Sequence, residues 1–379
     1  MAIFTREDLL QLLGPHSAPC VSILMPTHRH HPGTEQDPIR FKNLLNTAQG
    51  LLGKQYSSAE VRALLDPLAE LSNSRFWQYQ MDGLALFCSP DLLAQYQIPM
   101  KLRELAVVAD SFHVKPLIRF LQTNERYFVL ALSQKQVTLY EGTCYALGPV
   151  NLAELPSSMS EALGIEPQER HMNLRTLGRN IVGPIFHGHG APAESRKDDL
   201  SRFFRGIDLA LWEFLRDDAS PLILAGVDYY FPLYREISRC PNLAEKTVSG
   251  NFDHASPDQV HEQVQPVARA IFQERGETAL SAYESAHARG LGIEDVNTIA
   301  RLSAQGRVRR LLLAEGAHLW GRLDRESGAL SPAASQQDAS DDDILDDLAE
   351  SVLARGGDVM IVAADRMPRG GVAAAILRW

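Results

Sequence analysis

The sequence predicts a mixed α/β protein built from three domains, and three observations support this prediction. The chain has 379 residues, more than one hydrophobic core usually organises. Short apolar runs rich in β-branched residues alternate with segments of helical periodicity. With 45% apolar and 22% charged residues, the composition is that of a folded globular protein. We place the domain boundaries at residues 1–122, 123–265 and 266–379.

The first predicted domain alternates strands and helices. Its strands are expected at residues 20–26, 82–90 and 104–110. Asp37 supplies an N-cap and Pro38 a first-turn proline for one helix. Ser57 and Glu60 have the spacing of a capping box, which predicts the start of a second helix.

The second domain begins with a hairpin. Residues 126–133 and 136–142 are two apolar runs joined by a tight polar connection. A long amphipathic helix is predicted at residues 197–215, and a buried strand follows it at residues 221–227. This order predicts a second α/β unit.

The third domain is again a mixture of helices and strands. After a helical stretch at 257–305, strands are expected at residues 309–316, 358–364 and 372–379, with a helix at 344–356. The segment 331–343 carries small and polar residues, three consecutive aspartates and no apolar periodicity. It is therefore predicted to be a mobile surface loop, and its aspartates to be surface features.

Charge, cysteine and hydropathy patterns exclude several classes of protein. The net charge of -10 argues against a protein that coats nucleic acid indiscriminately, although local basic patches remain compatible with it. The four cysteines contain no Cys-x-x-Cys pair, so neither a disulfide framework nor a cysteine zinc knuckle is indicated. The N-terminal residues lack the pattern of a signal peptide, and no apolar run reaches the roughly 20 residues of a membrane span. We therefore expect a cytoplasmic protein.

Stretches from different parts of the chain, in a consistent order, give it a family resemblance. Residues 291–316 combine a Gly-x-Glu-Asp turn, a helix and an apolar strand, and residues 356–379 supply the closing strands of the same domain. Residues 107–121 lead from the first domain into the second, and residues 21–26 with the basic helix that follows them form the opening of the first domain. Together these stretches resemble the archaeal and eukaryotic class-one release factor and Pelota superfamily, closest to the bacterial archaeo-eukaryotic release factors of family three.

The resemblance implies a fold and a function. It implies a release-factor-like N-domain that faces the decoding centre, a ribonuclease-H-like middle domain, and a C-domain like the kink-turn-binding ribosomal proteins. Such a chain would mimic tRNA in the ribosomal A site during rescue or hibernation. The implied partners are the ribosome with its rRNA, the P-site tRNA and a delivery GTPase, with no membrane and no cofactor.

Release factors of this superfamily carry a Gly-Gly-Gln loop that acts on the ester of peptidyl-tRNA. The corresponding stretch here spans residues 186–206 and contains no glutamine. Its loop consists of His187, Gly188, His189, Gly190, Ala191 and Pro192. Glycine permits close approach, but Glu194 is a poor replacement for an amide because its carboxylate cannot donate a hydrogen bond and repels the ester and phosphate oxygens. We therefore expect binding without peptide release.

Other interpretations of this loop remain open. His187, His189 and Glu194 are the candidate catalytic residues if the protein hydrolyses peptidyl-tRNA or an RNA bond. The loop can equally be a solvated turn, or the chain a non-ribosomal α/β enzyme, since one fold hosts many functions. A metal site is not expected, because His-x-His without a defined third ligand is a weak signal.

Two groups of basic residues are candidate RNA contacts. On the long helix they are Arg196, Lys197, Arg202 and Arg205, and at one end of the first domain they are His28, Arg29, His30, His31, Arg40 and Lys42. The alternatives are a solvated helix face with Asp198, Asp199 and Asp208 as partners, and a solvated turn. His254, His261 and Glu262 lack the order of a metalloprotease motif and are predicted to be surface features.

Overall fold

The computed structural model describes residues 4–72, 74–164, 193–337 and 339–379. It contains two compact units: residues 1–123 with 274–379, and residues 124–273. The mixed α/β class predicted from the sequence is confirmed, whereas the three-domain division stays a prediction. None of the helices in the described residues is long and apolar enough to cross a membrane. All four cysteines are buried and free, as expected without a disulfide framework.

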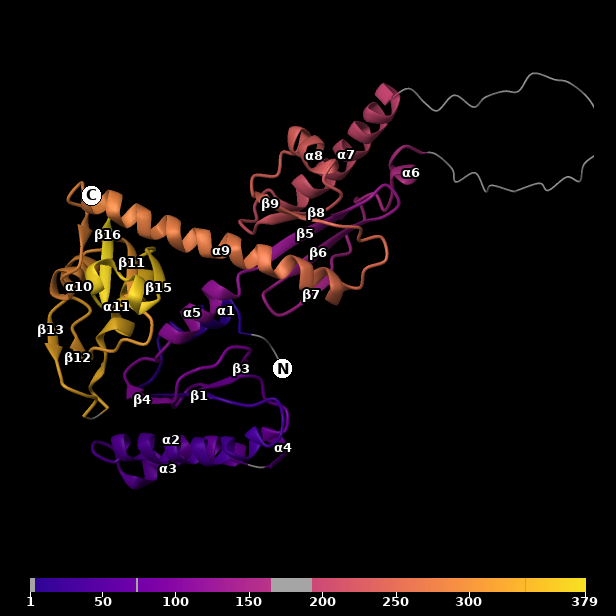
Figure 1. Ribbon diagram of the computed structural model, residues 1–379. Helices are drawn as coiled ribbons and strands as arrows, with labels where there is room; N and C mark the ends of the chain where they lie inside the picture. The colour runs from indigo at the N-terminus through magenta and orange to yellow at the C-terminus, as the bar shows by residue number, and fades with distance from the viewer. Residues whose placement is uncertain (1–3, 73, 165–192, 338) are drawn as a thin grey trace, which may run out of the picture. The chain divides into compact units, whose positions relative to one another are not determined.

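The N-terminal part of the first unit is an antiparallel sheet in the order β3-β2-β1-β4. Its strands are β1 (Cys20–Pro26), β2 (Gly83–Cys88), β3 (Leu93–Ile98) and β4 (Leu105–Ala109). Its helices are α1 (Arg6–Leu12), α2 (Asp37–Leu52), α3 (Ser58–Ala69), α4 (Ser74–Trp77) and α5 (Lys115–Thr123). Helices α2 and α3 cover one face of the sheet, and α1 and α5 cover the other (Figure 1).

Local signals explain where these helices begin. The Ser57 hydroxyl accepts from the Glu60 backbone N–H, and the Glu60 carboxylate accepts from the Ser57 N–H, so the predicted capping box of α3 is confirmed. The predicted N-cap of α2 is wrong, because Asp37 is the first helical residue and Gln36 precedes it. The Asp37 carboxylate bonds to His28 instead.

The C-terminal part of the first unit holds a second sheet in the order β10-β16-β11-β15. Its strands are β10 (Gly292–Ile293), β11 (Val308–Ala314), β15 (Asp358–Val362) and β16 (Ala373–Leu377), and only the β11–β15 pairing is parallel. A small sheet is formed by β12 (Trp320–Leu323), β13 (Leu330–Pro332) and β14 (Asp342–Asp343). Helices α10 (Val296–Ala304) and α11 (Ile344–Ala354) pack on the larger sheet.

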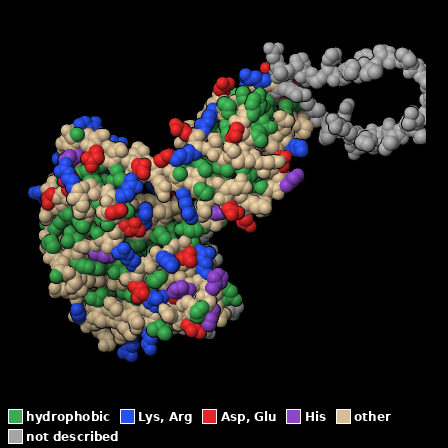
Figure 2. All heavy atoms as spheres, viewed as in Figure 1, with side chains coloured by type: hydrophobic (Ala, Val, Ile, Leu, Met, Phe, Trp, Pro, Cys, Tyr) green, Lys and Arg blue, Asp and Glu red, His purple; other side chains and the backbone are tan. Residues whose placement is uncertain are grey.

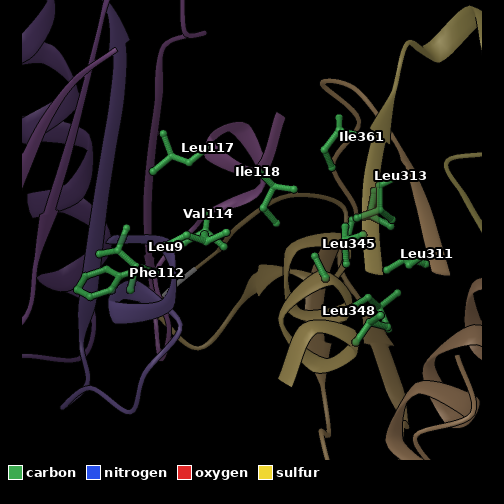
Figure 3. Close-up of a cluster of buried hydrophobic side chains, with 14 of the residues drawn as sticks. Leu9, Phe112, Val114, Leu117, Ile118, Leu311, Leu313, Leu345, Leu348 and Ile361 are labelled. Carbon is green, nitrogen blue, oxygen red and sulfur yellow. The ribbon is translucent and has the colours of Figure 1, made fainter. Parts of the chain in front are cut away.

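One hydrophobic core joins the two parts of this unit. Figure 3 shows Leu9, Phe112 and Val114 facing Leu345 and the strands of the C-terminal sheet. Helix α5 contributes further apolar side chains to the same core, and so does α11. Burial of apolar side chains typically stabilises a fold by roughly 1.5–3 kcal/mol each, so this shared core holds the unit together. It also encloses a set of charged side chains.

The second unit contains a mixed sheet in the order β7-β6-β5-β8-β9. Its strands are β5 (Tyr127–Leu132), β6 (Val137–Gly142), β7 (Leu147–Pro149), β8 (Leu222–Gly226) and β9 (Leu243–Ser249). Strands β5 and β6 form the predicted hairpin, and β8 pairs in parallel with β5 and β9. Helices α6 (Met159–Ala162), α7 (Ala193–Leu215) and α8 (Tyr230–Ile237) pack on one face, and the first turns of α9 (Pro257–His287) on the other.

Candidate functional site

The first predicted basic group lies after β1 and on α2, where carboxylates accompany most of its members. Asp37 is fully buried and lies 2.8 Å from His28 Nδ1 through Oδ1, while its Oδ2 accepts from the His28 backbone N–H at 2.9 Å. Arg40 reaches the same carboxylate at 3.4 Å and lies 2.6 Å from Glu104. The structure therefore brings His28 and Arg40 together, but around a shared negative charge.

The remaining members of this group are exposed. Arg29 donates two hydrogen bonds to Asp82, at 2.7 and 3.0 Å, and His31 lies 2.8 Å from Glu35. His30 and Lys42 are also exposed. Because both arginines and two of the three histidines lie beside carboxylates, the net positive charge at this end is small. Figure 2 likewise shows basic and acidic side chains interspersed over the visible face.

The second basic group lies on α7, whose two faces differ. Phe203, Phe204 and Ile207 are fully buried against the sheet of the second unit, whereas Lys197, Arg202 and Arg205 are exposed. Asp208 is not a partner of these cations. It is buried and accepts hydrogen bonds from the Ser238 hydroxyl and from the backbone and side chain of Arg239.

The predicted loop of His187, Gly188, His189, Gly190, Ala191 and Pro192 lies outside the described residues. Glu194 and Arg196 fall within α7, but their side chains are outside the description too. The candidate catalytic residues and this part of the RNA-binding surface therefore stay predictions.

His254 and Glu262 line a polar pocket of about 460 Å³, and His261 lies 3.0 Å from the Thr143 carbonyl oxygen.

The sequence did not indicate a cluster of buried charged residues that lies within the first unit. Asp342 and Asp343 are buried, so the predicted surface role of these aspartates is wrong. On α11 the acidic face of Asp346, Asp347 and Glu350 is buried too. These five residues are spaced so that they lie on one side of a helix and its cap. This spacing was the feature of the sequence from which the cluster could have been predicted.

Lys115 and His318 hold the carboxylate of Asp343. The Lys115 ammonium donates to Asp343 Oδ2 at 2.5 Å and to the Ala317 carbonyl at 2.6 Å, and His318 Nδ1 lies 2.8 Å from the same Oδ2. The backbone N–H groups of Leu319 and Leu345 donate to Oδ1. Burial opposes ionisation of Asp343, but the hydrogen bond from His318 and the charge of Lys115 outweigh it, and its pKa lies well below the usual range.

Arg325 neutralises part of the acidic face of α11. Its guanidinium contacts Asp347 Oδ1 and Glu350 Oε2, both at 2.6 Å. Burial nevertheless raises the pKa of Asp347 to about 7, and burial with the neighbouring Asp347 and Asp346 raises the pKa of Asp342 well above its usual range. Burial likewise raises the pKa of Asp346 to about 7, against the charge of Lys115. The cluster therefore holds more carboxylates than its cations neutralise.

His113 completes the cluster and has an unusual environment. The side chain is fully buried, and neither ring nitrogen has a hydrogen-bond partner. Burial lowers its pKa to about 3, so the ring is neutral at physiological pH. Its ring lies 5.7 Å from that of His318, and Nδ1 lies 3.6 Å from Asp346.

Residues 126–307 match the family described as bacterial archaeo-eukaryotic release factor family 3. No curated protein matches the chain. Several solved structures resemble it at low identity. The archaeal translation termination factor aRF1 is 16% identical, with 98% of this chain and 97% of that chain covered and a TM-score of 0.24.

Two other solved structures are similar to the chain over about three quarters of its length. Archaeal Pelota, in a model of ribosome-bound Pelota and ABCE1, is 13% identical over 79% of this chain and 72% of that chain, with a TM-score of 0.41. Saccharomyces cerevisiae Dom34, described as a translation termination-like factor interacting with Hbs1, is 10% identical over 76% and 72%, with a TM-score of 0.40. The match over residues 126–307 confirms the resemblance to the bacterial archaeo-eukaryotic release factors of family 3 that the sequence predicted.

Proposed function

We propose that the protein is a ribosome-binding translation factor that occupies the A site as a tRNA mimic, in rescue or hibernation, without releasing the peptide. The family to which residues 126–307 belong supports a role in translation. The absence of glutamine from residues 186–206 supports binding rather than hydrolysis, because the amide that characterises the release loop has no counterpart there.

The exposed cations of α7 are the observation that carries this proposal. Lys197, Arg202 and Arg205 project from a helix whose opposite face is anchored in the core of the second unit. The helix directly follows the glycine-containing segment 187–192 in the sequence. A rigid helix with exposed cations is suited to rRNA phosphates, and such contacts hold a protein in register without reading sequence.

The basic group near α2 is expected to contribute less. Phosphates would have to compete there with Asp82 for Arg29 and with Asp37 and Glu104 for Arg40. Contacts of this kind add to affinity only when several modest surfaces bind together. Delivery by a partner GTPase and contact with the P-site tRNA are further parts of the proposal.

Reversing the charge of the α7 surface should weaken ribosome binding. We expect the combined Lys197→Glu, Arg202→Glu and Arg205→Glu variant to bind 70S ribosomes at least roughly tenfold more weakly at about 0.1 M salt. Loss of three phosphate contacts should also reduce the slope of log affinity against log salt by about 2–3. Co-sedimentation with purified ribosomes across a salt series measures both quantities.

The matched control carries the same change in net charge elsewhere. Lys101, Lys135 and Arg289 are exposed and lie outside both basic groups, so their combined replacement by glutamate should leave binding within about twofold. Equal losses in the two triple variants would mean that only net charge matters. Absence of wild-type co-sedimentation at low salt would overturn the proposal.

The hydrolase interpretation is tested on ribosomes loaded with peptidyl-tRNA. We expect the wild-type protein to release no more peptide than buffer, because a carboxylate and two imidazoles replace the amide of the release loop. The measurement is release of labelled peptide over time. Release that disappears in the His187→Ala and His189→Ala double variant, with ribosome binding retained, would instead establish an enzyme.

A further inference from the structure

The buried cluster of the first unit holds more carboxyl groups than cationic side chains. Its buried carboxyl groups are Asp342, Asp343, Asp346, Asp347 and Glu350, with the exposed Asp110 beside them, and its cations are Lys115 and Arg325. Buried charges are costly unless they are paired, protonated or bound to a metal. The cluster therefore favours binding of protons or of an additional cation.

His113 indicates where a cation would bind. A fully buried imidazole without a hydrogen-bond partner is a costly arrangement for a side chain with no ligand. One nitrogen of His113, one nitrogen of His318 and one oxygen of Asp343 all lie within 4.8 Å of one another. A neutral ring with a free lone pair is the form in which histidine binds metal ions.

We propose that His113, His318 and Asp343 form a binding site for a divalent transition-metal ion of the zinc class. Two imidazole nitrogens and one carboxylate oxygen are a donor set that such ions accept, with a fourth position left for water or another oxygen. Magnesium and calcium prefer oxygen ligands and fit this set less well. The site is separate from ribosome binding, so either proposal can fail alone.

The position of the three donors assigns the ion a structural role. His113 lies between β4 and α5 in the N-terminal part, whereas Asp343 ends strand β14 of the small sheet in the C-terminal part and His318 precedes β12 of that sheet. A bound ion would connect segments about 200 residues apart in the sequence and stabilise the unit by binding only its folded form. The Lys115 ammonium competes for Asp343, so removal of the ion leaves that carboxylate paired.

A second group in the cluster does not carry the same inference. Asp110, Asp342 and Asp347 could also approach one cation, but all three offer only carboxylate oxygens. The guanidinium of Arg325 already contacts Asp347 at 2.6 Å, and the Ser111 hydroxyl donates to Asp342 at 3.3 Å. No buried ring nitrogen without a partner belongs to this second group.

Zinc binding to the full-length protein tests the site. After dialysis against a chelator, we expect one equivalent of Zn²⁺ to bind and to raise Tm by about 5–10 °C at a free concentration near a hundred times Kd. His318→Asn removes a partly exposed ligand but keeps an amide N–H near the Nδ1 position that can donate to Asp343, so it should abolish the shift with little effect on the metal-free Tm. The measurements are metal content after desalting and thermal unfolding with and without Zn²⁺.

His113→Leu gives a second, independent test. Because no group bonds to the His113 ring, the apolar replacement should leave the metal-free protein at least as stable as wild type. The zinc-dependent rise in Tm should be lost. His254→Ala is the matched control, since His254 shares a polar pocket with Asp253 and Glu262 in the other unit and should bind zinc as wild type does. Failure of wild type to bind one equivalent, or full binding by both site variants, would overturn the proposal.

Discussion

Replacing Lys115 with methionine should lower the free energy of unfolding by about 3–5 kcal/mol. The lysine is 3% exposed. Among the described residues, its ammonium and the His318 ring are the two groups that form an ion-pair contact with the Asp343 carboxylate. Methionine keeps the length of the stem but leaves Asp343 with the His318 imidazole and two backbone donors. An uncompensated buried charge is the physical cause of the loss.

Urea unfolding of the metal-free protein measures this loss, and two further variants identify its cause. Adding Asp343→Asn to Lys115→Met should recover much of the stability, because the asparagine oxygen can still accept the backbone hydrogen bonds. Arg310→Met removes an exposed ion pair to Asp358 and should cost less than about 1 kcal/mol. A Lys115→Met loss as small as that of Arg310→Met would show that Asp343 is not ionised in the folded protein.

Local signals predicted much of the fold correctly. The capping box of Ser57 and Glu60 and the hairpin of β5 and β6 depend on residues that are close in sequence. Both can therefore be identified from a short segment of one sequence. The apolar stripe of α7 likewise predicted which face is buried. Each of these features follows from a short-range rule whose partners are visible in one window of sequence.

The buried cluster could not be predicted because its partners are far apart in the sequence. Three consecutive aspartates are normally solvated, and nothing near residue 342 indicates a lysine 228 positions away that neutralises one of them. The same limit affected the basic group near α2. Asp82, which pairs with Arg29 from 53 positions away, was not foreseen as its partner. Long-range pairing, rather than local pattern, decides which charges are buried and which remain available.

Glu350→Gln should make the protein more stable than wild type at alkaline pH, by about 1–3 kcal/mol at pH 8. Glu350 is buried, its Oε2 contacts Arg325 at 2.6 Å, and its Oε1 has no hydrogen-bond partner. Burial and the nearby Asp346 raise its pKa well above the usual value, with Asp347 adding to this and Arg325 opposing it. At a pH between the unfolded and the folded pKa value, the folded protein therefore keeps the Glu350 carboxyl protonated, whereas the unfolded chain has lost this proton.

The sign of the pH dependence follows from the raised pKa. Stability due to protonated Glu350 is fully present below the unfolded value of about 4.3 and is lost as pH rises toward the folded value. Glutamine is neutral at every pH, so the difference in unfolding free energy between variant and wild type should be near zero below about pH 4 and grow above it. His113 and Asp343, whose pKa values are lowered, change stability in the opposite direction but equally in both proteins.

Unfolding by urea at a series of pH values measures this difference directly. Glu326→Gln is the matched control, because Glu326 is exposed next to Arg325 in the sequence and should change stability by less than about 0.5 kcal/mol at any pH. A Glu350→Gln difference that stays constant with pH would mean that Glu350 is already ionised in the folded protein. Arg325 would then neutralise Glu350 and Asp347 together, and the excess of negative charge would reside on Asp342 and Asp346 instead.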